Sequence, residues 1–557
     1  MKYDDILVEL GEFGSYQRRI YILVSLPVLF GAMHIVSSVF ILASPKHRCA
    51  LPGMLNDTYA VQGVYHETLL NVSIPRDGDA FSDCFLYSNS DDSQANKTQV
   101  ACDRYVYDQS VFESTIITKL NLVCHRRPLV AHATMILFAG LLVASLLLGL
   151  LSDLIGRKKT YLIALAIQVG SGIGLAFVDN YTAFVALRFL IGGSSIATGM
   201  CMFVIGIELV GPNKRSFAGV AIWFLWVAGL VLLGILGYLI RDWKTLQLVI
   251  SVPPIAFFSY WWLIPESPRW LVSKGRYEEA MKIISKAARV NKVELSPKCS
   301  NLENIEQEKE EKFWHMFTSP ILIFRTLIIF VNWLIVTMIY YGLTLNVGSL
   351  VGDIYVNYQI GNAVELVSYA IIIPMLDKMG RKAAHCSTMI IGGVACILTM
   401  FPVMYGNSSH SWITVTLSMI GRFGATAAFA AIYVFSAELF PTPLRNSAMG
   451  ASSLCGRVGG MISPYIADLG TLVSGNWSKA LPLVVFGGLT CLAGIMSLLL
   501  PETNNRTMPE TIADARRFGR SEKKNVYEMD IPPPDEHENE KAYPLQYIPK
   551  SDIPEKF

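Results

Sequence analysis

The sequence has few charged residues. Of its 557 residues, 16% are Asp, Glu, Lys or Arg and 52% are hydrophobic, whereas a soluble domain carries about 25% charged residues. This scarcity excludes an ordinary soluble globular protein of this length. The remaining charges nearly cancel, with 46 basic and 44 acidic side chains. Nothing in that balance indicates a nucleic-acid partner.

The sequence also lacks the short motifs of common energy-coupling and catalytic sites. It holds no G-x-x-x-x-G-K-[ST] phosphate loop, no H-E-x-x-H and no G-x-S-x-G string. These absences argue against ATP-driven transport and against a membrane-embedded hydrolase, so we expect neither an enzyme nor a cofactor. Six of the ten cysteines are scattered without metal-ligand spacing, and no metal site is predicted.

Long apolar runs, by contrast, are abundant. A hydrocarbon core of about 30 Å needs about 20 apolar residues in a helix that rises about 1.5 Å per residue. Twelve such runs predict an all-α membrane protein with twelve transmembrane helices in two six-helix bundles. The runs lie at about 20–43, 129–151, 160–178, 182–205, 216–239 and 246–264, then 326–345, 355–375, 384–404, 412–433, 446–470 and 481–500. The first is longer than a secretory signal's apolar core, so a cleaved leader is the less favoured alternative.

Basic side chains gather in alternate loops between these runs, which is the pattern of the cytoplasmic side of a membrane. With an even number of helices, both termini are then cytoplasmic. The basic positions are Arg18, Arg19, Arg157, Lys158, Lys159, Lys214, Arg215, Arg269, Lys274, Arg276, Arg381, Lys382 and Arg445.

The segment 44–128 has the features of an extracellular loop. It holds three N-x-[ST] glycosylation sequons, at Asn56, Asn71 and Asn96, which are acceptors in secreted segments. It also holds four cysteines, an even number that fits disulfides in an oxidising compartment. Four cysteines allow three pairings, and the sequence does not choose among them. The four are Cys49, Cys84, Cys102 and Cys124.

The predicted organisation follows from these signals. The parts are a cytoplasmic N-terminus (1–19), an N-terminal bundle (20–264) with the large extracellular loop (44–128), a cytoplasmic loop (265–325), a C-terminal bundle (326–500) and a cytoplasmic, largely disordered tail (501–557). The tail is assigned as disordered because it is polar, acidic and rich in proline.

Four short strings recur at matched places in the two bundles. Such a repeat is typical of secondary transporters, whose substrate site lies near the membrane midplane between the halves. The pairs are Asp153-Leu-Ile-Gly156-Arg157-Lys158 with Asp377-Lys-Met-Gly380-Arg381-Lys382, Glu208 and Arg215 with Glu438 and Arg445, Pro265-Glu266-Ser267 with Pro501-Glu502-Thr503, and Arg188-Phe189 with Arg422-Phe423. Because Arg188 and Arg422 repeat, a structural role is favoured for both.

The repeated loops predict a cytoplasmic gate. Aspartates before a helix meet the positive end of its dipole, glycines permit tight turns, and arginines fork onto carboxylates. We hypothesise that these charged residues form ion pairs that hold the cytoplasmic side closed while the outside is open. The alternative is that the charges only set the topology. The predicted gate residues are Asp153, Gly156, Arg157, Glu208, Arg215, Asp377, Gly380, Arg381, Glu438 and Arg445.

Three features together resemble one family. They are the Asp153–Lys158 run, the strings Pro265-Glu-Ser-Pro-Arg-Trp-Leu271 and Ala437-Glu-Leu-Phe-Pro-Thr-Pro-Leu-Arg445, and the loop with cysteines and sequons. This combination is similar to the organic cation and carnitine transporters of the major facilitator superfamily. The resemblance covers the chain to about residue 518 and implies transport of small organic ions across the plasma membrane by alternating access.

The resemblance also implies a substrate pocket lined by aromatic side chains and a few charges. Aromatic faces attract quaternary or protonated amines, although helix packing is the alternative for each ring taken singly. The matching positions are Trp223, Trp226, Trp333, Tyr340, Tyr341, Glu365 and Arg457. His34 is a weaker candidate, for which a packed histidine is equally acceptable.

Glu365 and Arg457 both lie roughly 15 Å into their helices, near the midplane, where an ionised side chain is costly. We therefore expect them to face each other or a wet cavity, with a buried structural ion pair as the alternative. The resemblance places aspartate at the Arg457 position in cation carriers and arginine in carnitine and anion carriers. An arginine fork suits a carboxylate, so a carnitine-like zwitterion is favoured over a simple cation. An organic anion exchanger and a non-transporting sensor remain alternatives, and the coupling ion, sodium or proton, is not determined.

Overall fold

The computed structural model describes residues 3–54, 56–77, 80–88, 98–296, 302, 317, 319–406, 408–441, 444–471, 477–504, 506, 509 and 511–518. Residues up to Phe518 form one compact unit. The predicted sequon at Asn96, most of the acidic part of the loop 265–325 and the tail after 518 lie outside the described residues.

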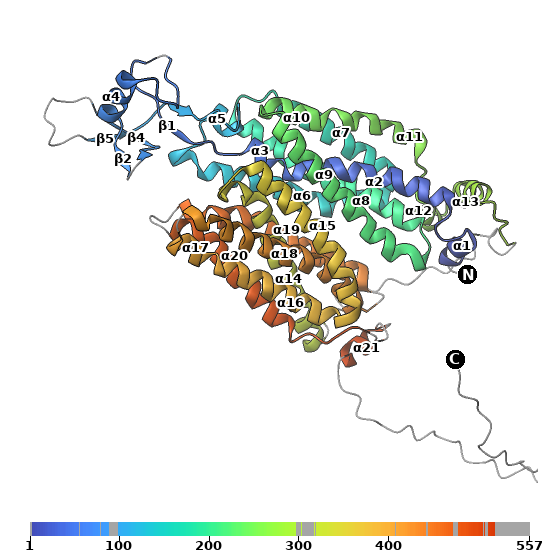
Figure 1. The fold of residues 1–557 in the computed structure, drawn as a ribbon. Coiled ribbons are helices and arrows are strands. Elements are labelled where there is room, and N and C mark those ends of the chain that lie inside the picture. The colour runs from blue at the N-terminus through green and yellow to red at the C-terminus, as the bar shows by residue number, and fades with distance from the viewer. Residues whose placement is uncertain are drawn as a thin grey trace, which may run out of the picture. The chain divides into compact units, whose positions relative to one another are not determined.

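The N-terminal half of the helical region, residues 15–263, has helical structure at each of the first six predicted runs (Figure 1). The last of these is broken because Pro253 and Pro254 remove two backbone donors. The elements are α2 (Ser15–Val36) with α3 (Ser38–Ile41), α6 (Pro128–Ile155), α7 (Arg157–Leu175), α8 (Tyr181–Glu208), α9 (Pro212–Leu239), and α10 (Trp243–Ser251) joined by a 3-10 helix (Pro253–Ser259) to α11 (Tyr260–Leu263).

The C-terminal half, residues 320–497, matches the second six runs in the same way. Its elements are α14 (Pro320–Leu345), α15 (Ile354–Met379), α16 (Arg381–Leu398) with α17 (Met400–Tyr405), α18 (Ser411–Leu439), α19 (Arg445–Ala467) and α20 (Trp477–Ser497). The predicted all-α membrane fold is confirmed.

Ten helices among the described residues are long and apolar enough to cross a membrane. The two predicted spans that do not meet this measure are α7, which begins with three basic residues, and α19, which is rich in glycine and serine. Small residues lower hydropathy but allow close helix packing. At Gly459 of α19, an added Cβ would lie 2.0 Å from the carbonyl oxygen of Leu334 in α14. Close packing against α14 therefore explains why α19 is rich in small residues.

The two halves meet through matched pairs of helices. Within the halves, α8 packs along α6 and α7, and α18 packs along α15 and α16. Between the halves, α6 packs along α19, and α9 packs along α15. In each pair between the halves, the second helix of one half packs along the fifth helix of the other half. The interface therefore has the same internal repeat as the sequence.

The segment after α3 folds into a small region of strands and helices at one end of the helices, opposite α1 (Tyr3–Glu9), α12 (Pro268–Ser273) and α13 (Tyr277–Asn291) (Figure 1). Its strand pairs are antiparallel: β1 (His47–Cys49) with β6 (Tyr105–Tyr107), β2 (Arg76–Asp77) with β3 (Ala80–Phe81), and β4 (Phe85–Tyr87) with β5 (Gln99–Ala101). Its helices are α4 (Val64–Ser73) and α5 (Ile116–Leu120).

Two disulfides cross-link this region and decide among the three pairings. Cys49 is bonded to Cys102, and Cys84 is bonded to Cys124, with 5.7 Å between the Cα atoms of each pair. The side chains of Asn56 and Asn71 are exposed, which leaves glycosylation at these two sites a prediction.

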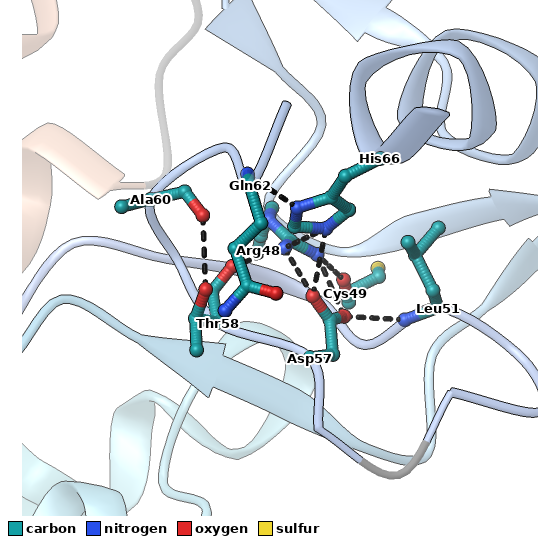
Figure 2. A network of polar contacts seen from close by, with 8 residues as sticks. All are labelled: Arg48, Cys49, Leu51, Asp57, Thr58, Ala60, Gln62 and His66. Carbon is teal, nitrogen blue, oxygen red and sulfur yellow. Dashed lines mark hydrogen bonds and ion pairs between the residues drawn. The ribbon is translucent and has the colours of Figure 1, made fainter. Parts of the chain in front are cut away.

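A buried polar network supports the first disulfide (Figure 2). Arg48 donates to both carboxylate oxygens of Asp57, at 3.0 and 2.5 Å, and His66 Nε2 lies 3.1 Å from Asp57 Oδ1. Burial would raise the pKa of Asp57, but the hydrogen bonds from Arg48 and from the Leu51 N–H outweigh it and hold the pKa below its usual value. The loop that carries Asn56 is therefore tied to β1.

Candidate functional site

A cluster of aromatic rings lies where α9 meets α15 and α18. Trp223 of α9 contacts Trp226 and Tyr369 at 6.4 Å each, Phe429 at 6.0 Å and Tyr433 at 5.9 Å, measured between ring centroids. Because α9 belongs to the N-terminal half and the other two helices to the C-terminal half, the cluster spans the interface. Trp223 lies near the middle of α9, and the cluster therefore lies near the predicted midplane.

The other three predicted aromatic residues belong to α14 and contact rings of this cluster or of α6. Trp333 contacts Tyr433 at 4.4 Å, and its indole N–H donates to Ser436 at 2.9 Å. Tyr340 stacks on Phe429 at 5.4 Å, and Tyr341 contacts Phe138 of α6 at 4.6 Å. The structure thus brings all five predicted aromatic residues to one interface.

Three further rings of this cluster were not predicted from the sequence: Tyr369, Phe429 and Tyr433. Phe429 and Tyr433 occur inside an apolar run, where nothing in the composition distinguishes them from packing residues. Tyr369, in contrast, follows Glu365 by four residues, which places the two on one face of α15. The spacing of four between Phe429 and Tyr433 puts them on one face of α18. That spacing was the available signal, and it becomes informative only once the partner helix is known.

A hydrogen-bond chain runs from this ring cluster to a buried carboxylate. The Trp226 indole N–H donates to the Tyr340 hydroxyl at 3.1 Å, and that hydroxyl donates to Glu365 Oε1 at 2.8 Å. Arg422 donates from Nη2 to Glu365 Oε2 at 3.2 Å and to Asn362 at 3.1 Å. Glu365 is 0% exposed, so its charge interacts with its neighbours at low dielectric constant.

The sequence predicts that Glu365 and Arg457 face each other or a wet cavity, and the structure does not pair them with each other. Glu365 pairs with Arg422, a residue that the repeat assigned to structure alone. The physical reason is helix packing: α15, which carries Glu365, packs along α18, which carries Arg422, whereas α19 packs along α14 and α6. The position of each residue along its helix placed both charges near the midplane. It did not give the direction in which each side chain points around the helix axis.

Arg457 lies in the same region with its charge uncompensated among the described residues. It is close enough to act electrostatically on Tyr341 and Tyr433. No described carboxylate forms an ion pair with it, and its Nε is buried without a described hydrogen-bond partner. A hydrogen bond joins the guanidinium to the Tyr341 side chain. Because that partner carries no negative charge, the positive charge of Arg457 can still attract an anionic group.

The N-terminal half contains a cluster of charges where α6, α7 and α8 end or begin. Arg157 lies 2.9 Å from Asp153 and 3.7 Å from Glu208. Glu266 accepts hydrogen bonds from the backbone N–H of Arg157 at 3.0 Å and of Lys158 at 3.1 Å. These are the first two N–H groups of α7, which lack partners within the helix.

The C-terminal half repeats this cluster. Arg381 lies 3.6 Å from Asp377 and 3.0 Å from Glu438. Glu502 accepts from the N–H of Arg381 at 2.9 Å and of Lys382 at 3.1 Å. Arg445 acts electrostatically on Glu438, so the predicted proximity of these two residues is present.

The turns before α7 and α16 require glycine. Gly156 and Gly380 have φ of 106° and 91°, a region that side chains rarely adopt. A Cβ on Gly156 would lie 2.4 Å from Glu266 Oε2, and a Cβ on Gly380 would lie 2.7 Å from Glu502 Oε2. The predicted glycine turns are present, and the capping carboxylate adds a second reason for them.

Two details of the predicted gate are wrong. The carboxylates at the starts of α7 and α16 are Glu266 and Glu502, because Asp153 and Asp377 lie at the ends of the preceding helices. Arg215 does not reach Glu208, since the chain turns between α8 and α9; it pairs instead with Asp4 of α1 at 2.5 Å. The repeated ion pairs each join helices of one half, so their part in gating stays a prediction.

The described contacts between the halves lie toward the disulfide-bonded region. Phe40 of α3 contacts Tyr355 at 5.7 Å and Tyr358 at 5.1 Å, both on α15. Gln359 donates to the Val231 carbonyl at 3.0 Å. From Trp223 outward, side chains of the two halves thus pack against each other on the predicted extracellular side.

Comparison with known proteins identifies the family. The sugar (and other) transporter family model matches residues 78–514. An organic cation transporter protein of Drosophila melanogaster is 38% identical over 541 residues, which cover 93% of this chain and 95% of that protein. Organic cation/carnitine transporter 2 of Homo sapiens is 32% identical over 534 residues, which cover 92% of this chain and 93% of that protein.

Among solved structures, the inward-open conformation of the xylose transporter XylE from E. coli covers 88% of this chain and 98% of its own. The TM-score is 0.58 at 16% identity, which shows the major facilitator fold. The chain therefore belongs to the sugar (and other) transporter family, among the organic cation and carnitine transporters of solute carrier family 22.

Proposed function

We propose that this chain is a plasma-membrane secondary transporter that moves small organic cations or carnitine-like zwitterions by alternating access. The observation that carries the proposal is the cluster of aromatic rings between the halves, which Trp226 and Tyr340 join to the buried ion pair of Glu365 and Arg422. Ring faces attract ammonium groups by about 0.5–2 kcal/mol each. The relatives named for organic cations support the same substrate class.

The charges near this cluster favour a substrate with a carboxylate as well. Arg422 neutralises Glu365, so Arg457 is the remaining charge, and a carboxylate on the substrate would compensate it. An ammonium group would then lie against the rings and a carboxylate against Arg457. The same observation supports a second candidate function, exchange of organic anions.

The conformation and orientation fit one half of a transport cycle. Basic loops, sequons and disulfides together support cytoplasmic termini and an extracellular segment 44–128. With that orientation, the contacts of Phe40 with Tyr355 and Tyr358 close the extracellular side above the ring cluster. In the outward-facing state these contacts would separate, as rocking of the halves requires.

Uptake in cells that express the full chain tests the proposal. Labelled carnitine, tetraethylammonium and benzoate are compared with and without sodium, against cells that lack the protein. We expect carnitine uptake to exceed that of the other two and to rise clearly over the background. Uptake of benzoate alone would favour the anion exchanger, and uptake of none of the three would overturn the proposal.

A further inference from the structure

A cavity lies between the extracellular segment and both halves. Its volume is about 700 Å³, within the range of about 300–1,000 Å³ that is typical of sites for small molecules. Its wall includes the start of β1, Ile117 of α5 and Leu122 just after it, the start of α6, the start of α15 and the end of α19. The ring cluster around Trp223 contributes no residue to this wall.

The wall of this cavity carries more negative than positive charge. Four carboxylates line it, from Asp83, Asp108, Asp353 and Asp468, against the two basic side chains of Lys46 and Arg127, which leaves an excess of two negative charges. Asp83 is exposed, and its carboxylate has no hydrogen-bond partner among the described residues, which leaves it accessible to a solute. A concave wall with an excess of one sign of charge raises the local concentration of oppositely charged solutes.

His47 adds an acceptor to this wall. Its Nδ1 lies 3.4 Å from the Pro45 carbonyl oxygen, which assigns the proton to Nδ1 and leaves Nε2 as an acceptor. Nε2 is buried and has no described partner. Burial lowers the pKa of His47 against the opposing effect of Asp83, which favours the neutral form of the ring.

The arrangement of the carboxylates suits an organic cation better than a metal ion. The described residues contain one group of three potential ligand atoms within 4.8 Å of one another, His47 with Cys84 and Cys124, and its two sulfur atoms are joined in a disulfide. The four carboxylates do not converge in this way. Apolar wall residues, including Leu42, Phe112 and Ile354, would pack against the alkyl part of an organic ion.

The floor of the cavity is the closed side of the transporter. Phe112, which lines the cavity, contacts Tyr355 at 6.0 Å, and Tyr355 donates to the Val111 carbonyl at 3.2 Å. Tyr355 in turn stacks on Phe40. A solute in the cavity would therefore lie directly outside the contacts that must separate for outward opening.

We propose that this cavity is an outer site that binds a small quaternary or protonated amine before the extracellular side opens. The inference rests on the orientation and substrate class given under the proposed function. The site would hold the ion between the carboxylate of Asp83 and the apolar wall, and it would raise the rate at which cations reach the central ring cluster.

Thiol labelling of the full chain in cells tests this site without measuring uptake. Ser110 lines the cavity and its side chain is exposed, so Ser110→Cys places a thiol there. Two membrane-impermeant thiosulfonates of the same reactivity are compared, one carrying trimethylammonium and one carrying sulfonate. The control is Val64→Cys on α4, a position that is 81% exposed and lies outside the cavity wall.

We expect the ratio of cationic to anionic labelling rates at Ser110→Cys to exceed the control ratio by about tenfold. Adding Asp83→Asn should lower this ratio toward the control, and tetraethylammonium should slow cationic labelling at Ser110→Cys but not at Val64→Cys. Equal ratios at the two positions, or no protection by tetraethylammonium, would overturn the site. Because labelling needs no transport, a failure of uptake with intact labelling would instead count against the proposed function.

Discussion

The two halves of this molecule share their loops but differ in their membrane-embedded charges. In the loops, Arg157 with Glu208 and Arg381 with Glu438 occupy the same places. In the helices, the repeated arginines diverge. Arg422 pairs with the buried carboxylate of Glu365, whereas the described hydrogen bond of Arg188 goes to the Ser38 hydroxyl.

The difference teaches which part of the repeat serves structure. The loop clusters satisfy helix ends, a requirement that both halves share. A buried carboxylate is needed in neither half for folding and is costly in both. Glu365 lies beside the ring cluster in the C-terminal half, and no described carboxylate pairs with Arg188. This difference supports the proposal that substrate recognition depends mainly on the C-terminal half.

The largest expected effect is a difference in stability between variants of Arg422 and variants of Arg188. Arg422→Gln leaves Glu365 buried and unpaired, so we expect it to lower the free energy of unfolding by about 3–5 kcal/mol. Arg188→Gln strands no described carboxylate, and we expect a change of about 1 kcal/mol. Denaturant titration of the purified protein in nanodiscs measures both. Adding Glu365→Gln to Arg422→Gln should restore most of the stability; equal losses for the two single variants would break the comparison.

Substrate choice should depend on the uncompensated charge of Arg457. Arg457→Gln removes the group that would bind a carboxylate, so the kcat/KM for carnitine should fall about 10–100-fold, or about 1.4–2.7 kcal/mol, while that for tetraethylammonium changes less. Arg457→Lys, which keeps the charge but not the fork, is the matched control and should lose less. A parallel loss for both substrates would show that Arg457 does not discriminate between them.

The loop clusters should be similar in strength, with a small excess in the C-terminal half. Arg381 lies 3.0 Å from Glu438, whereas Arg157 lies 3.7 Å from Glu208. We expect Arg381→Gln to lower the free energy of unfolding by about 1–3 kcal/mol and Arg157→Gln by less within that range. The same denaturant titration ranks them, and the opposite order would contradict the geometry.

The smallest effect should come from the capping carboxylates. Glu266→Gln and Glu502→Gln keep an acceptor for the first N–H groups of α7 and α16 but remove the charge that faces each helix dipole. We expect a loss of about 0.3–1 kcal/mol for each, equal within error. Thermal unfolding of the two variants side by side measures it. A large difference between them would show that the loops are not equivalent.

Much of the fold could be predicted from the sequence because apolar length and loop charge are local properties. The runs gave the positions of the helices, and the repeat gave the glycine turns at Gly156 and Gly380. The capping role of Glu266 could not be read in this way, since it reaches a helix start 109 residues earlier in the chain. Likewise, four cysteines left three pairings open, because pairing depends on which strands come together.

The sequence by itself therefore determined that this protein is a membrane transporter with the major facilitator fold, and it named the aromatic and charged residues near the midplane. Only the tertiary structure decided which of those charges meet. The position along a helix gives the depth in the membrane at about 1.5 Å per residue. Which side chains meet depends in addition on how neighbouring helices are rotated and packed against each other. That is why Glu365 and Arg457 could be placed at one depth from the sequence, while the partner of Glu365 proved to be Arg422.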